Sequence, residues 1–187
     1  MSKTYRSNIL NSQERAFSEG TVLFEDDSWL FFEINADEET DLEFYLNHEV
    51  KLFRNSDWIA GILLEDGIIV TPYERVRIEN GDRVQIKKHI MYSLENLLDE
   101  ISDDAFHQFI TTLNNLHYSI YDSIFCHNHL VFLENQKIKQ GVNFMTFDNG
   151  IEVCAVQHHF TYYKKKRDRF EFTLSTGKRI VIENLLP

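Results

Sequence analysis

Hydrophobic and polar residues alternate in short runs between positions 49 and 88, and this period of two is typical of β-strands. Turn residues separate the runs, because Gly and Asn accept the positive backbone angles of tight hairpins. Four short strands joined by tight turns predict a small, SH3-like antiparallel barrel. The strands expected are Val50 to Arg54, Trp58 to Leu64, Ile68 to Val70 and Arg83 to Lys87, with turns at Glu65-Asp66-Gly67 and Glu79-Asn80-Gly81-Asp82.

Helices are expected to flank this barrel. The pattern before it predicts a helix from Asn8 to Ser18, closed by Gly20, and then strands at Thr21 to Phe24 and Ser28 to Ile34. A second helix is expected from Asp37 to Asn47, because apolar residues there recur at helical intervals and acids stand at its start.

The pattern changes after position 90. A helix is expected from Ser93 to Leu116, divided in two at Ser102-Asp103-Asp104, and the segment from Ser119 to Glu134 fits a helix or a strand. The period then becomes two again and predicts an antiparallel β-meander. Its strands are Val142 to Phe147, Ile151 to Tyr163, Arg169 to Leu174 and Arg179 to Glu183. The chain is therefore expected to be α+β, with parts at 1–90 and 91–187 that meet near His89 to Ser93.

Composition sets the class of protein. A hydrophobic fraction of 43% predicts a packed core, and the chain has no apolar run long enough for a membrane span or a secretory signal. We expect a cytoplasmic protein without membrane association. Its two cysteines, Cys126 and Cys154, are expected to be free thiols. The net charge of −11 argues against nucleic acid as a partner.

Acidic residues are concentrated near the front of the chain. Between Ala16 and Val50 there are eleven carboxylates and no Lys or Arg. We interpret this run as a solvated face rather than as a docking surface for a basic partner. The one basic cluster, Lys164 to Arg169, is interpreted as a turn between strands rather than as a phosphate contact.

Four segments carry a resemblance to known proteins. They are Ser102 to Phe106, Gln140 to Met145, Val156 to Phe160 and Asp168 to Phe172. Through them the chain resembles a small family of uncharacterised intracellular bacterial proteins, a domain of unknown function, over most of its length. The resemblance implies no site residues.

Cysteine and histidine residues are the first candidates for chemistry, since thiolate and imidazole are ligands that zinc prefers. Cys126, His129 and His158 could form a metal site, although their spacing is unlike that of structural zinc sites. On a strand, His158 and His159 would point to opposite faces, so that one of them at most could join such a site. The alternative is a buried cysteine with histidines at the surface or at the edge of the core.

A second hypothesis makes Cys126 a nucleophile, with His129 or His158 as its base and Asp122 as the group that orients the imidazole. No glycine-rich turn for an oxyanion accompanies Cys126. The chain also lacks the glycine-rich loops that bind nucleotides, so no cofactor is predicted.

The pattern favours a non-enzymatic interaction or regulatory module, which binds a protein partner or a second copy of itself. Its candidate contact residues are aromatic side chains near turns and strand ends: Trp58, Tyr73, Tyr162 and Tyr163. The alternative is a small metal-binding protein or a Cys/His-dependent enzyme built around Cys126, His129 and His158. Whether those side chains converge in a pocket distinguishes the two.

Overall fold

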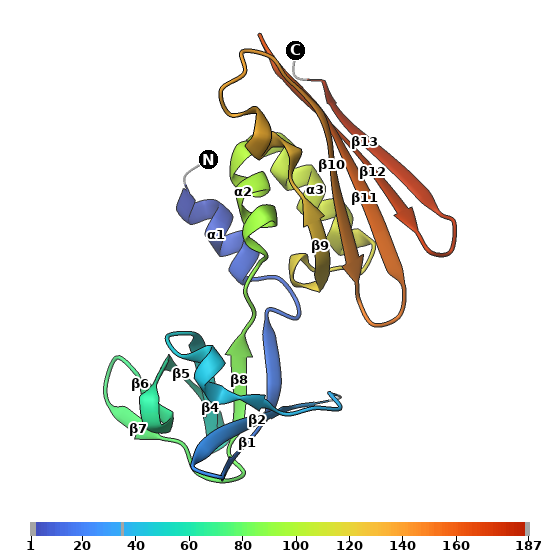
Figure 1. Cartoon of the computed structure of the whole chain (residues 1–187). Coiled ribbons are helices and arrows are strands. Elements are labelled where there is room, and N and C mark those ends of the chain that lie inside the picture. The colour runs from blue at the N-terminus through green and yellow to red at the C-terminus, as the bar shows by residue number, and fades with distance from the viewer. Residues whose placement is uncertain (1–2, 35, 186–187) are drawn as a thin grey trace. The chain divides into compact units, whose positions relative to one another are not determined.

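The computed structural model describes residues 3–34 and 36–185, and these residues form two compact units (Figure 1). The inserted unit is Ala16–Lys88, and the outer unit is made by the residues before and after it. The sequence pattern places the division near residue 90, with residues 3–15 in the first part. These residues instead pack in the outer unit, where Ile9 and Leu10 contact its core.

The inserted unit holds one open antiparallel sheet. Its strands lie in the order β3-β2-β1-β8-β4-β5-β6-β7. Because β3 and β7 are at the two edges of the described sheet and do not pair, the sheet does not close into the SH3-like barrel that the strand pattern predicts. The strands are β1 (Phe17–Glu25), β2 (Ser28–Glu33), β3 (Thr40–Asp41), β4 (Glu49–Arg54), β5 (Asp57–Leu64), β6 (Ile68–Val70), β7 (Arg75–Arg77) and β8 (Arg83–Lys87).

One face of this sheet buries the core of the inserted unit. Alternate residues of β4, Val50 and Leu52, and of β8, Val84 and Ile86, are buried there, as a period of two requires. Full burial of one such side chain stabilises the fold by roughly 1.5–3 kcal/mol. The four strands predicted between positions 49 and 88 are all present.

The helix predicted from Asp37 to Asn47 is wrong. The segment forms the short strand β3 and then a 3₁₀ turn, η1 (Leu42–Tyr45), which Asn47 follows with a positive φ of 67°. The apolar spacing is satisfied by this single turn. Leu42 enters the core, and Tyr45 and Leu46 pack against it.

The outer unit is a five-stranded antiparallel sheet with helices on one face (Figure 1). The strand order is β13-β12-β11-β10-β9, so β10 to β13 form the predicted meander. Side chains of the helices and of the inner sheet face make one buried core. The strands are β9 (Ser123–His127), β10 (Lys139–Asp148), β11 (Val153–Tyr162), β12 (Lys166–Leu174) and β13 (Arg179–Leu185), and the helices are α1 (Lys3–Asn11), α2 (Tyr92–Glu100) and α3 (Asp103–Asn115).

Helices α2 and α3 confirm the predicted division at Ser102. Its hydroxyl accepts a hydrogen bond from the Ala105 N–H at 3.2 Å and so begins α3. The segment from Ser119 to Glu134 is not a helix, because two 3₁₀ turns, η3 (Ile120–Asp122) and η4 (His129–Leu133), enclose the strand β9. The first helix lies earlier than the predicted range Asn8 to Ser18. Within the described residues, no helix has the length and apolar character needed to span a membrane. The fold is α+β.

Candidate functional site

Cys126 lies at the end of β9, where it is half-buried. It lines a hollow of about 550 Å³ together with its neighbour His127. Burial raises the pKa of the Cys126 thiol, although a hydrogen bond with Ser93 opposes this shift. The thiol is therefore a weaker source of thiolate than an exposed cysteine. Cys154 is fully buried, and burial raises its pKa to about 11.

His158 lies in the interior of the outer unit, inside a chain of hydrogen bonds. The Asn143 amide donates to its Nδ1 at 3.0 Å, so Nε2 carries the proton and donates to Asp168 at 2.9 Å. The Tyr162 hydroxyl also donates to Asp168, at 2.5 Å. His158, Asn143 and Asp168 are almost completely inaccessible to solvent. Burial lowers the pKa of His158, although the contact with Asp168 opposes it.

His129 and Asp122 have other partners. The ring of His129 packs against Phe132 and Phe160, and its backbone N–H donates to the Asn143 amide oxygen at 2.7 Å. The carboxylate of Asp122 binds Arg15 at 2.6 Å and accepts from the Ser119 N–H, which completes the capping box of η3. Cys126 and Asp122 thus have partners of their own, whereas His129 and His158 both contact Asn143 and Phe160 but are not hydrogen-bonded to Cys126 or Asp122. Among the described side chains, no three His, Cys, Asp or Glu are grouped so as to hold a metal ion.

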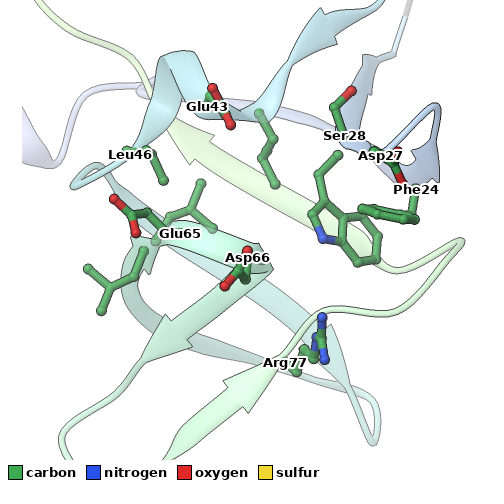
Figure 2. A pocket seen from close by; sticks show the side chains of 13 residues that line it. Phe24, Asp27, Ser28, Glu43, Leu46, Glu65, Asp66 and Arg77 are labelled. Atoms are coloured by element: carbon green, nitrogen blue, oxygen red, sulfur yellow. The ribbon is translucent and has the colours of Figure 1, made fainter.

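Three turns of the inserted unit surround a hollow of about 260 Å³, which we call the tryptophan pocket (Figure 2). The turns are Asp26-Asp27 between β1 and β2, η1, and the 3₁₀ turn η2 (Glu65–Gly67). Apolar side chains line its interior and charged side chains lie at its rim. The lining residues are Phe24, Asp27, Ser28, Trp29, Leu42, Glu43, Leu46, Leu63, Leu64, Glu65, Asp66, Gly67 and Arg77.

The first turn positions the aromatic side chains. Asp26 and Asp27 both have positive φ angles, 49° and 64°, as a two-residue type I′ hairpin requires. This turn sets the register in which Phe24 lies opposite Trp29. Their ring centroids are 5.2 Å apart and the rings are inclined by 59°. A polar two-residue turn thus brings a half-buried indole and an exposed phenyl ring to one side of the pocket.

The turn η2 forms the opposite side of the pocket and depends on Gly67. Its φ is +67°, and a Cβ atom there would lie 2.6 Å from Ile78 and 2.8 Å from the Trp29 Nε1 atom. The backbone can therefore approach the indole only because position 67 has no side chain. Asp66, with a φ of 58°, precedes it and lies at the rim.

The turn η1 supplies a residue to each part of the pocket. The Asp41 carboxylate accepts a hydrogen bond from the Glu43 N–H at 2.8 Å and begins the turn. Leu42 is then buried in the core of the unit. Glu43 lies exposed at the rim (Figure 2). One capped turn therefore contributes an apolar lining residue and an acidic one.

The rim of the tryptophan pocket is acidic. Asp27, Glu43, Glu65 and Asp66 are exposed, and none of them forms an ion pair with a Lys or Arg of the described chain. Arg77 supplies the one cationic side chain among the lining residues. The whole inserted unit has seven basic and seventeen acidic residues, a net charge of −10 out of −11. The rim thus adds a local negative field to that of the unit.

The indole of Trp29 has an unusual environment. Its Nε1 atom is buried and has no hydrogen-bond partner within the described part of the chain. A buried donor without a partner costs roughly 1–3 kcal/mol. This unfavourable free energy arises where the Trp29 indole lies beside the backbone of Gly67.

The sequence analysis pointed to other aromatic residues. Trp58 is half-buried and packs against Phe53, with ring centroids 5.1 Å apart, and Tyr73 is exposed on a loop. Tyr163 is exposed, whereas Tyr162 is buried beside Asp168. Trp29 was missed because it lies in the acidic run that was interpreted as a solvated face. The signal that could have found it is the polar pair Asp26-Asp27 between Phe24 and Trp29.

Comparison with known proteins gives a family without an assigned activity. A family model described as a protein of unknown function (DUF2777) matches residues 4–184. The uncharacterised protein YisN of Bacillus subtilis (strain 168) is 31% identical over 179 residues, which cover 95% of this chain and 90% of that protein. No solved structure matches the chain. The chain belongs to the DUF2777 family of bacterial proteins of unknown function.

Proposed function

We propose that the chain is an interaction module whose tryptophan pocket binds a positively charged side chain of a partner protein. The observation that carries this proposal is an apolar, aromatic lining surrounded by four exposed carboxylates. A lysine or arginine side chain has the matching form, since its stem is apolar and its end is charged. Its charged end binds at the rim while its stem covers the rings of Phe24 and Trp29.

The charge of the inserted unit supports the same partner chemistry. A net charge of −10 on a unit of this size attracts a basic segment from a distance and raises its association rate. Salt screens this attraction, so binding should weaken as ionic strength rises. The acidic residues between Ala16 and Val50, which the sequence pattern suggested were a solvated face, thus contribute to the negative electrostatic potential around the tryptophan pocket.

The environment of the sulfur and imidazole groups favours this function over the Cys/His-dependent alternative. Burial raises the pKa of Cys126, and both ring nitrogens of His158 are already hydrogen-bonded. A nucleophile needs a lowered thiol pKa and a base with a free nitrogen. Cys126 and His158 would have to rearrange to meet these requirements, whereas the tryptophan pocket can accept a ligand as it stands.

Fluorescence of Trp29 tests the proposal. The chain has two tryptophans, so Trp58→Phe leaves Trp29 as the single reporter. Hexalysine and hexaarginine are expected to change its emission in a saturable way at low salt, and hexaglutamate is not. Replacing Glu65 by Gln and Asp66 by Asn together should weaken binding about tenfold, since exposed charge pairs contribute up to about 1 kcal/mol each.

A matched variant separates the pocket from net charge. Glu38 and Glu39 are exposed in the same unit but do not line the pocket, so Glu38→Gln with Glu39→Gln removes the same charge elsewhere. Its affinity should remain within about twofold of the parent. Equal losses in the two double variants would mean that only the overall charge binds the peptides. Absence of any saturable change with either basic peptide would end the proposal.

A further inference from the structure

The strand β9 forms one edge of the sheet of the outer unit (Figure 1). It pairs with β10 on one side and with no other strand of the described chain on the other. Its five residues, Ser-Ile-Phe-Cys-His, include no Lys, Asp, Glu or Pro. In many proteins, such residues on an edge strand prevent it from pairing with a strand of another chain. This edge therefore keeps the ability to pair with an added strand.

Exposed apolar side chains surround the edge. Ile124 and Phe125 are on β9, and Phe144 is on β10. Phe125 lies opposite Thr146 and His127 opposite Phe144, so the two phenyl rings are diagonal neighbours on the outer face of the sheet. An apolar patch of this kind on a protein surface commonly marks an interaction site.

A hollow of about 550 Å³ adjoins the same edge, and we call it the β9 groove. It lies between one side of α2 and the segment formed by the end of β9 and η4. Its apolar walls include Leu130, Val131, Phe132 and Tyr92, of which Phe132 and Tyr92 are 70% and 79% exposed. Such a volume is within the range of roughly 300–1,000 Å³ typical of ligand sites.

The charge of the β9 groove limits what can occupy it. Asp99, Glu100 and Glu134 line it, and no Lys or Arg is among its lining residues. Two copies of this chain joined through this groove would bring two sets of carboxylates together, which disfavours self-association. A partner segment that carries Lys or Arg beside its apolar residues would instead be attracted by these carboxylates.

We infer that the free edge of β9 binds an extended segment of a partner protein, with an apolar side chain of that segment in the β9 groove. The added segment forms main-chain hydrogen bonds along β9, and the groove selects the side chain. Lysine or arginine residues of the segment face the exposed carboxylate of Glu134. This site belongs to the outer unit and does not rest on the tryptophan pocket of the inserted unit.

The test is a selection of random ten-residue peptides displayed on phage against the full-length chain. The enriched peptides are expected to alternate apolar residues with others and to carry Lys or Arg. Binding should become at least tenfold weaker in the double variant Val131→Ser with Phe132→Ser, because both side chains are exposed walls of the groove. A bound peptide should also slow the reaction of Cys126 with a thiol reagent and protect backbone amides of β9 from hydrogen exchange.

Two controls make the outcomes distinguishable. The double variant Ile151→Ser with Tyr163→Ser removes two exposed apolar side chains of the outer unit away from the groove and should leave binding unchanged. The double variant Glu65→Gln with Asp66→Asn tests the tryptophan pocket separately. Selected peptides that bind both serine variants equally, or the failure to select any peptide, would overturn the inference. A native mass of two chains that falls to one in Val131→Ser with Phe132→Ser would replace the partner by a second copy.

Discussion

At the scale of single residues, Asp168 is a shared acceptor in the interior of the outer unit. His158 and Tyr162 donate to one of its oxygens, and Ser102 lies 3.4 Å from the other. The Asn143 amide holds His158 from the far side, and the ring of Phe170 stacks on it with centroids 4.3 Å apart. Because the imidazole is neutral and both its nitrogens are used, it stabilises the fold only in that protonation state.

This arrangement predicts a loss of stability in mild acid. Burial lowers the pKa of His158 below its ordinary value of 6.5, so below that pH the unfolded chain binds a proton that the folded chain does not. The free energy of unfolding should therefore fall as pH decreases from about 6.5, by about 1.4 kcal/mol for each pH unit until the lowered pKa is reached. Urea unfolding of the wild type and of His158→Gln at pH 7.5 and 5.5 measures this contribution.

The advantage of the wild type over His158→Gln should shrink at the lower pH. His127→Gln keeps the buried imidazole and replaces an exposed side chain, and it serves as the control. A constant difference between the wild type and His158→Gln would show that the buried histidine does not titrate in this range.

The opposite orientations of His158 and His159 could be predicted from the sequence, but the hydrogen-bond partners of His158 could not. Alternation along a strand puts His158 and His159 on opposite faces, and the structure confirms that His158 is buried while His159 is partly exposed. Asn143 and Asp168 lie on the two neighbouring strands, opposite His158 and Phe160. Their contact depends on the pairing register of three strands, which the residue pattern alone did not specify.

At the scale of elements, one side chain of the helix α1 makes several polar contacts with α2 and α3. The Arg6 guanidinium donates to the Asp103 carboxylate, at 2.5 Å, and to the Leu98 and Ile101 carbonyls at the end of α2. It also lies over the ring of Phe106, 4.9 Å from its centroid. Carbonyls at a helix end lack partners within the helix, so a cation there satisfies them.

Removal of this side chain should therefore loosen α1. Arg6→Ala is expected to lower the free energy of unfolding by about 2 kcal/mol, since charge-assisted hydrogen bonds are lost and carbonyls are left without a donor. Amide hydrogen exchange of residues 3–11 should rise first. Arg6→Lys should recover less than half of the loss, because an ammonium group cannot reproduce a planar fork. Arg75→Ala, at an exposed position of the inserted unit, serves as the control. Equal exchange in all three variants would refute this account.

Strands were predicted better than helices, because their signals lie close together in the sequence. Between Val50 and Lys87 each strand is bounded by turn residues, so the alternation of hydrophobic and polar residues and the positions of the turns indicate the same strands. From Asp37 to Asn47 the apolar spacing fits one 3₁₀ turn as well as a helix, and tertiary packing of Leu42 decided the outcome. The tryptophan pocket is assembled from three turns that are distant in sequence. The residues of each turn could be recognised in the sequence, but the meeting of the three turns around one pocket could not.

At the scale of the whole molecule, the inserted unit begins and ends at neighbouring positions. Phe17 pairs with Lys87 across β1 and β8, and the Lys88 N–H donates to the Ala16 carbonyl at 2.9 Å. The unit also buries its own core of apolar side chains. Adjacent ends and a separate core are the properties of a domain that can be inserted into another.

The inserted unit should consequently fold alone. A fragment of residues 16–88 is expected to unfold cooperatively in urea, with a midpoint close to that of the same unit in the full chain. Both tryptophans lie in this unit, so their fluorescence follows its unfolding in either protein. As the counterpart, a chain in which a short Gly/Ser linker replaces residues 16–88 should retain the exchange protection of the outer sheet. A fragment without a cooperative transition would mean that the unit depends on the rest of the chain.

The contact of Arg6 with Asp103 has a consequence for synthesis on the ribosome. The two residues are 97 positions apart, and the entire inserted unit is made between them. At about 5–20 residues per second, α1 leaves the ribosome some 5–20 s before its binding partner exists. During that interval the inserted unit can complete its fold while α1 has nothing to pack against. The helix α1 is thus synthesised before the inserted unit but reaches its native contacts only after that unit has been made.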